Sequence, residues 1–426
     1  MFLSQIFAFT KVFYIFVVEI LIVAMDYKDI QPLLNAYHRK LATTDLRFKR
    51  YLYNQINWDA RLLGIKGARG VGKTTMLMQH IKETFDNIDD VLYVSLDNLW
   101  FQNHSAEELV EFLYTRGVNH IYFDEVHKYK GWITFIKNMY DNYPDLNIVY
   151  TGSAMLAIDN STSDLSRRQS LYTLHGLSFR EYLEYEGIFK FSPVSLEELL
   201  CKHTGYAMEI TSRIKVLKHF EEYLSGCYYP YYKESGKDYL MRLSEVVQLI
   251  IDSDIPAVED RITYTTKQKI KKLLMVIAEN VPLEPNINKL AASLESTRDQ
   301  TLKMLYWLDR AALLYLLTEA PKDYKHLTGP KKIYLNNTNL MNALTGKVSE
   351  GTKRETFFAN QVGAFATLTM PKQADFMVEG KYLFEVGGPR KTFKQIADLP
   401  DSYLVIDDLE VGNGNRIPLW MFGFLY

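Results

Sequence analysis

A glycine-rich segment at residues 67–74 has the residue types and spacing of a phosphate-binding loop. It reads Gly-Ala-Arg-Gly-Val-Gly-Lys-Thr, follows an apolar stretch and leads into a helical pattern. Glycines let the backbone N–H groups turn inward around phosphate oxygens, and the N-terminus of the helix adds partial positive charge. This is the Walker A pattern in its strand–loop–helix context. The candidate nucleotide-binding residues are Gly67, Ala68, Arg69, Gly70, Val71, Gly72, Lys73, Thr74 and Thr75.

Two of these residues have distinct expected roles. Lys73 is expected to reach the β- and γ-phosphates of ATP, and the Thr74 hydroxyl is expected to hold Mg²⁺. ATP and Mg²⁺ are therefore the predicted cofactors. A phosphate loop alone would serve a kinase, a GTPase or a motor, so a second motif must decide among them.

That second motif is an acidic pair at the end of an apolar strand. Ile121, Tyr122 and Phe123 predict a short buried strand that ends in Asp124 and Glu125. In a parallel sheet both carboxylates would lie at the carboxyl edge, beside the loop. Asp124, the Walker B acid, is expected to hold Mg²⁺ directly or through water, and Glu125 to polarise the attacking water as general base. A solvated acidic pair is the alternative.

Further polar candidates follow along the chain. The strand predicted within residues 146–156 ends in Thr151, Gly152 and Ser153, and Ser153 is the predicted γ-phosphate sensor. Arg167 and Arg168 come after it on a polar segment, and one of them could be a catalytic arginine. Helix or strand capping by Ser153 and a plain surface charge on the arginines are the alternatives.

The order of the segments GARGVGKTT, YFDEVHKY, VYTGSAM, DLSRR and GLSFREYL resembles AAA-type ATPases that carry a C-terminal domain of unknown function. The resemblance covers nearly the whole chain from Met25. It implies an additional-strand P-loop fold, ATP with Mg²⁺, and a nuclease-like tail. It also implies Arg168 as the position of the catalytic arginine, although Arg167 stands where the family has glycine.

The 426 residues are too many for one core, and the pattern of elements predicts an α/β chain of several domains. A P-loop ATPase core is expected at 25–180, a helical lid and connector at 181–262, a winged-helix domain at 263–345, and an α+β restriction-endonuclease-like domain at 346–426. In the third helix of the winged-helix domain, Leu302, Leu305 and Leu308 are expected to point inward. Its outward face mixes charges of both signs, which favours protein docking over DNA reading: Arg298, Gln300, Lys303, Asp299 and Asp309.

A second, tentative site lies near the C-terminus. Asp375 and Glu385 stand in order on two adjacent predicted strands, and Glu355 lies on the preceding helix. In restriction-endonuclease-like folds such carboxylates hold a divalent metal, and the lysine of a Glu-x-Lys motif orients the water. That lysine is missing here, so Lys391 or Lys394 would have to fold back across a Gly-Gly-Pro turn. A degenerate module that does not cut nucleic acid is the favoured interpretation.

Residues 1–24 form an apolar leader that Lys11 and Glu19 interrupt. A charge at mid-bilayer costs about 2.5–3.5 kcal/mol, so we expect the native start at Met25 rather than a membrane anchor. The net charge of -2 gives no global attraction to nucleic acid, and two cysteines without a CxxC motif indicate neither a zinc site nor a disulfide framework. A cytoplasmic location is expected.

The sequence thus predicts an ATPase that uses ATP hydrolysis with Mg²⁺ to drive or gate movement of its winged-helix and nuclease-like domains. A slow nucleotide switch that controls a protein partner is one alternative. An ATP-gated DNA nuclease or defence factor is another. An unknown protein partner is expected, while DNA binding and a homo-oligomer stay open.

Overall fold

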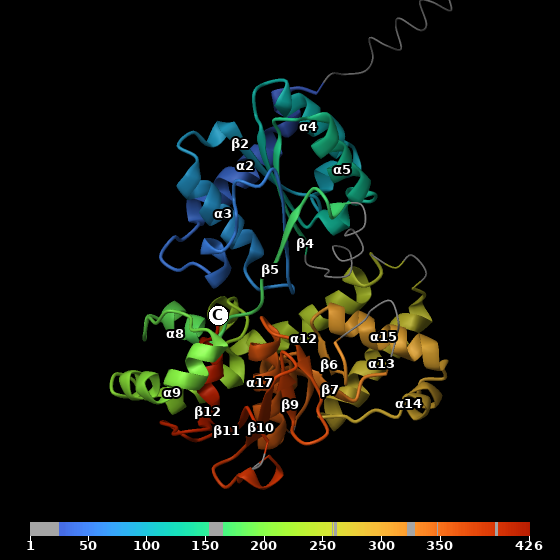
Figure 1. Ribbon diagram of the computed structural model, residues 1–426. Coiled ribbons are helices and arrows are strands. Elements are labelled where there is room, and N and C mark those ends of the chain that lie inside the picture. Colours follow the sequence, from blue (N-terminus) through green and yellow to red (C-terminus); the bar gives the residue numbers. More distant parts are fainter. Residues whose placement is uncertain are drawn as a thin grey trace, which may run out of the picture.

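The computed structural model describes residues 25–152, 165–257, 259, 262–321, 329–346, 348–396 and 399–426. Figure 1 shows two bodies, which we call the N-terminal body (residues 25–173) and the C-terminal body (residues 174–426). The apolar leader at 1–24 and the predicted sensor Ser153 lie outside the described residues. Across the part of the chain that is described, no helix has the length and apolarity needed to cross a bilayer.

The N-terminal body is built on a parallel sheet with the strand order β2-β3-β4-β1-β5. The strands are β1 (Leu62–Lys66), β2 (Val91–Ser95), β3 (His120–Asp124), β4 (Asn147–Gly152) and β5 (Ser170–Thr173). All neighbouring pairs run parallel, and their nearly continuous apolar runs fit strands that are covered on both faces. β4 lies between β1 and β3, which is the additional strand that the resemblance implied. The predicted α/β fold of the core is therefore confirmed.

Helices cover both faces of this sheet, with α2 and α3 on one side and α4 and α5 on the other (Figure 1). They are α2 (Tyr27–Thr43), α3 (Lys73–Thr84), α4 (Ala106–Tyr114) and α5 (Trp132–Asn142), with short 3-10 turns η1 (Tyr51–Asn54), η2 (Ile88–Asp90), η3 (Leu99–Gln102) and η4 (Val126–Lys128). The start of α4 illustrates local control. The Ser105 hydroxyl accepts from the Glu108 N–H while the Glu108 carboxylate accepts from the Ser105 N–H, a reciprocal capping box.

The C-terminal body begins with helices that pack on elements from the far end of the chain. They are α8 (Phe179–Tyr185), α9 (Leu196–Thr211), α10 (Val216–Gly226), α11 (Tyr232–Ser235), the 3-10 turn η5 (Gly236–Asp238), α12 (Tyr239–Leu249) and the π-helical turn η6 (Ile250–Asp254). α9 packs on the last strand of the chain and on the 3-10 segment that follows that strand. One helix of the predicted lid, α9, therefore packs against the C-terminal sheet.

The predicted winged-helix segment has the expected order of elements, and its fold name stays a prediction. It comprises α13 (Tyr264–Asn280), α14 (Ile287–Ser293), α15 (Arg298–Arg310), and the antiparallel pair β6 (Leu314–Leu317) and β7 (Lys332–Leu335). Leu302, Leu305 and Leu308 are buried as expected. Asp309, expected on the outward face, is instead buried, and its Oδ1 accepts a hydrogen bond from the Leu316 N–H at 3.0 Å.

The last part of the chain forms a mixed sheet with the strand order β12-β11-β10-β9-β8. Its elements are α16 (Thr338–Leu344), α17 (Glu350–Gly363), β8 (Leu368–Thr369), β9 (Phe376–Val378), β10 (Tyr382–Gly387), η7 (Phe393–Gln395), β11 (Ser402–Ile406), β12 (Arg416–Pro418) and η8 (Leu419–Phe424). β10 pairs antiparallel with β9 and parallel with β11. An α+β domain is thus present, while its relation to restriction endonucleases stays a prediction.

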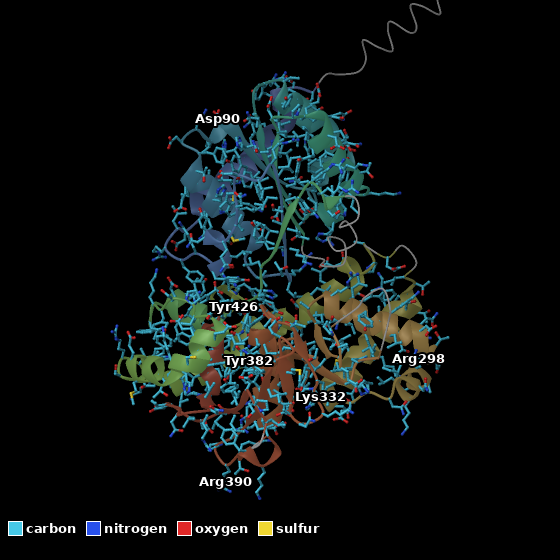
Figure 2. All side chains as sticks on the ribbon, viewed as in Figure 1. Asp90, Arg298, Lys332, Tyr382, Arg390 and Tyr426 are labelled. Carbon is cyan, nitrogen blue, oxygen red and sulfur yellow. The ribbon has the colours of Figure 1, made fainter. Side chains whose placement is uncertain are left out.

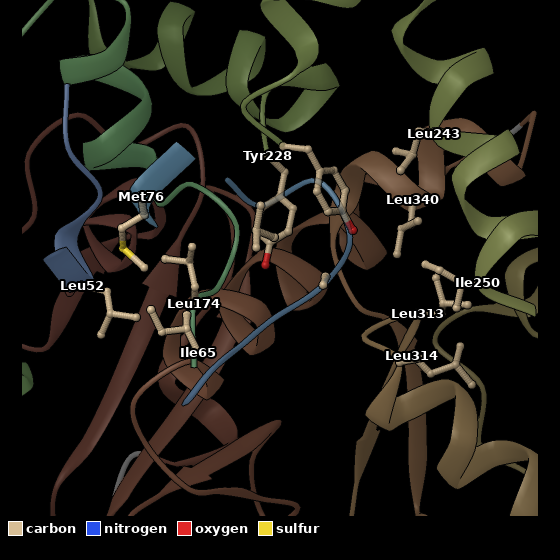
Figure 3. Packing of buried hydrophobic residues seen from close by; sticks show 14 of the residues in the cluster. Leu52, Ile65, Met76, Leu174, Tyr228, Leu243, Ile250, Leu313, Leu314 and Leu340 are labelled. Atoms are coloured by element: carbon tan, nitrogen blue, oxygen red, sulfur yellow. The ribbon is translucent and has the colours of Figure 1, made fainter. Parts of the chain in front are cut away.

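The two bodies share one apolar core. Figure 3 shows buried side chains of both bodies, such as Ile65 of β1 and Leu243 and Leu313 of the C-terminal body, all members of one cluster. At the junction lies Tyr426 (Figure 2). Its backbone oxygen accepts hydrogen bonds from Ser178 Oγ at 2.7 Å and from Arg180 Nε at 2.9 Å.

Candidate active site

The glycine-rich loop joins β1 to α3 at the carboxyl edge of the parallel sheet. Gly72 has a φ of 95°, a left-handed conformation that favours glycine, and Lys73 follows as the first residue of α3. A Cβ atom at Gly67 would lie 2.3 Å from the carbonyl oxygen of Leu174, just after β5. Glycine is therefore required at position 67 for two reasons. The sequence suggested the close approach of a phosphate, and the structure adds the close packing against Leu174.

Lys73 is buried at the centre of the loop. Its Nζ donates hydrogen bonds to the carbonyl oxygens of Gly67 at 2.9 Å and Ala68 at 3.0 Å. Burial lowers the pKa of the Lys73 ammonium, and the nearby carboxylates of Glu125 and Asp124 offset only part of this effect. The ammonium therefore lies inside the loop, and the carboxylates that face it come from the end of β3.

Three hydroxyl groups hold the Asp124 carboxylate. Its Oδ2 accepts from Thr74 Oγ1 at 2.6 Å and from the Tyr93 hydroxyl at 2.7 Å, and its Oδ1 accepts from Thr151 Oγ1. Mg²⁺ prefers hard oxygen ligands, so the adjacent Thr74 hydroxyl and Asp124 carboxylate fit the predicted Mg²⁺ site. Sequence reasoning missed Tyr93 and Thr151. Thr151 stands two positions before the predicted Ser153, whereas nothing in the apolar run of β2 marks Tyr93.

Glu125 has a strained backbone beside the loop. Its φ of 54° and ψ of 39° place it in the left-handed region, which is uncommon for a residue with a side chain. The Glu125 N–H donates to Thr151 Oγ1 at 3.3 Å. Its Oε2 lies 3.7 Å from Arg69 Nη2 and 3.4 Å from His127 Nε2, and the side chain is 16% exposed. A carboxylate that solvent can reach at this edge can accept a proton from water.

A cavity of about 660 Å³ opens beside the loop. Lys73 and Phe48 line it from the N-terminal body, and Tyr185 and Tyr231 line it from the C-terminal body. The Tyr231 ring packs on the tip of the loop, because a Cβ at Gly70 would lie 2.5 Å from Tyr231 Cε1. The volume is in the range of small-molecule sites. Parts of the predicted lid thus form a wall of the candidate nucleotide cavity.

One acidic residue of the C-terminal body reaches the same edge. Asp254 ends η6, and its carboxylate accepts from Arg69 at 3.2 and 3.3 Å and from Lys128 Nζ at 2.7 Å. Burial raises the pKa of Asp254, but hydrogen bonds from His127, Arg69 and Lys128 outweigh burial and hold the pKa below its usual range. No sequence signal marks Asp254, because 185 positions separate it from Arg69.

The structure does not bring Arg168 to this site. The Arg168 Nε lies 2.8 Å from Asp141 Oδ1. Asp141 lies near the end of α5, and Arg168 comes just before β5 in the chain. β5 runs parallel to β1, so Arg168 lies at the amino edge of the sheet, opposite the loop. Within its own chain, Arg168 therefore lies away from the candidate nucleotide site. A role at the site of a second copy stays a prediction, as does the sensor role of Ser153, outside the described residues.

The structure brings the tentative second-site residues together. The Asp375 N–H donates to Glu385 Oε2 at 3.1 Å, and the Val386 N–H donates to Asp375 Oδ2 at 2.9 Å. Lys391 folds back and pairs its ammonium with Glu385 Oε1. A Cβ at Gly387 would lie 2.7 Å from Lys391 Cγ, so the Lys391 side chain fills the space of a side chain at 387. Of the two lysines considered from sequence, Lys391 reaches the carboxylates.

Charge repulsion and burial shape this second site. Burial first, then the charges of Glu355 and Glu385, raise the pKa of Asp375 to about 6. Glu355 on α17 accepts from Lys332 Nζ at 2.6 Å and from the Tyr334 hydroxyl at 2.7 Å. Among the residues that the structure describes, no group of three or more His, Cys, Asp or Glu side chains is arranged to hold a metal ion. The carboxylates are instead paired with lysines and backbone N–H groups.

Two family models match parts of the chain. A family model described as AAA domain matches residues 59–183, and a model described as a domain of unknown function (DUF8612) matches residues 217–351. Residues 59–183 are therefore similar to the AAA domain family. The resemblance expected from the motif order is confirmed for this part of the chain.

Individual relatives are more distant. The chain is similar to an uncharacterized protein, MJ1544, of Methanocaldococcus jannaschii, at 29% identity over 185 residues, which are 39% of this chain and 40% of that one. The chain thus spans about two fifths of the length of this curated relative. Among solved structures it is similar to the S. cerevisiae Hsp104–ADP complex (14% identity, 64% of this chain, 41% of that chain, TM-score 0.27) and to AMPPCP-bound DnaA from Aquifex aeolicus (14%, 67%, 89%, TM-score 0.23). Scores this low assign no function.

Proposed function

We propose that the chain is an ATP hydrolase. One observation carries the proposal: the loop lysine, the loop threonine, the last residue of β3 and the Glu125 that follows it meet at one sheet edge, with Thr74 Oγ1 2.6 Å from Asp124 Oδ2. The loop N–H groups and Lys73 would bind the phosphates, while Glu125 would accept a proton from the attacking water. Thr74 and Asp124 would hold Mg²⁺, which when bound neutralises phosphate charge.

Two substitutions test the proposal. Lys73→Ala should lose ATP binding, because it removes the buried ammonium that faces the phosphates. Glu125→Gln should keep ATP binding and lose turnover by about 10² to 10⁴-fold, the usual contribution of a general base. Glu245→Gln, an exposed carboxylate on α12, is the matched control. Unchanged turnover in Glu125→Gln would remove Glu125 from the mechanism, and no ATP binding by the wild-type chain would end the proposal.

The proposed use of hydrolysis is to gate movement between the two bodies. Its support is that residues of both bodies line the nucleotide cavity, and Tyr231 packs on the loop tip. A nucleotide in the cavity would therefore contact both bodies, and a change in nucleotide state could shift the equilibrium between two arrangements. Rapid turnover that a partner or DNA stimulates further would favour this gate. Slow turnover that nothing accelerates would favour a nucleotide switch for a protein partner.

A second candidate function is cleavage of nucleic acid at the second site. The contact of Lys391 with Glu385 supports it, because the lysine takes the place that the Glu-x-Lys pattern requires. The lack of a three-ligand cluster among the described residues counts against it. The test is incubation of the protein with plasmid and linear DNA in Mg²⁺ or Mn²⁺, with and without ATP. Cutting that Glu385→Ala abolishes would establish the nuclease, and no cutting under any condition would reject it.

A further inference from the structure

The nucleotide edge and the C-terminal body share one charged cluster around the buried Asp254. Asp254 is 2% exposed, and its Oδ1 lies 3.2 Å from Arg69 Nη2 and 2.7 Å from Lys128 Nζ. The same Arg69 Nη2 lies 3.7 Å from Glu125 Oε2. His127 Nε2 stands between the two carboxylates, 3.4 Å from Glu125 Oε2 and 3.9 Å from Asp254 Oδ1. Arg69 is therefore shared by one carboxylate from each body.

The turn at the end of α12 positions Asp254 in this cluster. α12 ends in the π-helical turn η6, and Asp254 is the last residue of that turn. π-helical turns are rare in proteins overall, and those that occur are often found at functional sites. Lys128 Nζ also donates to Ser253 Oγ at 2.8 Å, so two consecutive side chains of η6 contact the residues that follow β3. This contact is a specific join between η6 and the candidate active site.

Arg69 has two competing attractions once a nucleotide is bound. It is the third residue of the phosphate-binding loop, so a phosphate held by that loop would attract its guanidinium. A buried carboxylate that loses one cationic partner becomes unfavourable, so Asp254 opposes the transfer of Arg69 to phosphate. ADP lacks the terminal phosphate and should compete less than ATP. The contact is therefore suited to distinguish the two nucleotides.

We propose that Asp254 is a positioning residue which the C-terminal body contributes to the nucleotide site. Asp254 holds Arg69 until the γ-phosphate of ATP replaces Asp254 as the partner of Arg69. This inference rests on the proposed ATP site, because the competition needs a phosphate in the loop. Binding of ATP then weakens the contact of η6 with the N-terminal body, whereas ADP leaves that contact in place. The proposed gate thereby acquires a specific residue contact that responds to nucleotide.

The test measures the dissociation constants of a non-hydrolysable ATP analogue (AMPPNP) and of ADP for the full chain by calorimetry. Asp254→Asn removes the competitor for Arg69, so AMPPNP should bind about tenfold more tightly while ADP changes by less than about twofold, as expected when a competing state is removed. Asp252→Asn is the matched control, because its carboxylate is exposed and pairs with Lys271. Equal shifts for both nucleotides, weaker AMPPNP binding, or no shift would overturn the inference.

A second measurement needs no substitution and so covers a variant that fails to fold. Hydrogen exchange of the wild-type chain should rise across residues 250–257 with AMPPNP and not with ADP, because only AMPPNP draws Arg69 away. Equal exchange with both nucleotides would overturn the inference. If the wild-type chain binds neither nucleotide, the proposed function fails as well. If it binds both and Asp254→Asn matches Asp252→Asn, only the role of Asp254 fails.

Discussion

Breaking the buried ion pair between Arg50 and Glu181 should destabilise the protein strongly. Arg50 is 5% exposed, and its guanidinium donates to both oxygens of the Glu181 carboxylate, at 3.0 and 2.9 Å. It also donates to the carbonyl oxygens of His175 at 2.7 Å and Gly176 at 2.8 Å, and to that of Val71 in the phosphate-binding loop. One cation thus joins the loop to the start of α8.

The substitution Glu181→Gln keeps the size of the side chain and removes its charge. Glu181 is fully buried, and its carboxylate also accepts from the Tyr51 N–H at 2.6 Å. Removing one charge of a buried pair costs roughly 3–5 kcal/mol, because the other charge stays buried without compensation. The glutamine oxygen has two lone pairs and can still accept from Arg50 and from the Tyr51 N–H, so we expect a loss near the lower end, about 3 kcal/mol.

The matched control is Glu209→Gln. Glu209 pairs with Arg213 one helical turn away, at 3.2 Å, with side chains 44% and 61% exposed. Such a pair contributes about 0.3–0.5 kcal/mol. Urea unfolding followed by circular dichroism would compare both variants with the wild type, with each transition fitted separately because a chain of two bodies can unfold in more than one step. A loss for Glu181→Gln no larger than for Glu209→Gln would refute the reasoning.

Two further predictions concern Asp375 and Tyr93. The folded-state pKa of Asp375, about 6, lies above its usual 3.8, so the stability that its protonated form contributes is fully present below about pH 4 and lost as the pH rises through 6. Asp375→Asn should remove this loss of folding free energy. The loss is up to roughly 3 kcal/mol, because one pKa unit corresponds to about 1.4 kcal/mol. The melting temperatures of the variant and the wild type should therefore diverge between pH 4 and 7.5. The absence of a pH-dependent difference would contradict the prediction. Tyr93→Phe removes a hydrogen-bond donor to the Asp124 carboxylate. A hydrogen bond to a charged group is worth about 1.5–3 kcal/mol. The Mg²⁺ concentration for half-maximal ATP turnover should therefore rise about tenfold or more. An unchanged Mg²⁺ requirement would show that Thr74 and Thr151 suffice to hold the carboxylate.

Contiguous features of the site could be predicted from sequence. The loop at 67–74 and the strand that ends in Asp124 need residues next to one another in the chain, so their chemistry shows in the order of letters. The burial of Leu302, Leu305 and Leu308 could be predicted for a similar reason, because helical periodicity fixes which residues share a face. The additional strand was implied by the resemblance to AAA-type ATPases, which rests on the order of the motifs.

Contacts between distant segments could not be predicted in this way. Asp254 lies 185 positions from Arg69, and no local pattern shows that η6 ends against the loop. The resemblance implied Arg168 as the catalytic arginine, but not whether it acts in its own chain or in a second copy, and the structure places it at the amino edge of the sheet. The choice between Lys391 and Lys394 likewise depended on the geometry of a turn, which the sequence permits for both.

The contacts between the bodies differ in what could break them. Residues 174–181 are held to the N-terminal body by the Leu174 N–H, which donates to the Lys66 carbonyl at 2.7 Å, and by the buried guanidinium of Arg50, which pairs with Glu181 at 2.9 Å. A bound phosphate offers no stronger partner to the neutral Leu174 N–H. The Arg50 guanidinium is only 5% exposed and enclosed by its partners, whereas the Arg69 side chain is 26% exposed and can turn from Asp254 to a phosphate. Under the proposed gate, therefore, the contact at Asp254 would break first while residues 174–181 stay joined. The movement that this difference favours is a rotation of one body about residues 174–181, because complete separation would also expose the core that both bodies share.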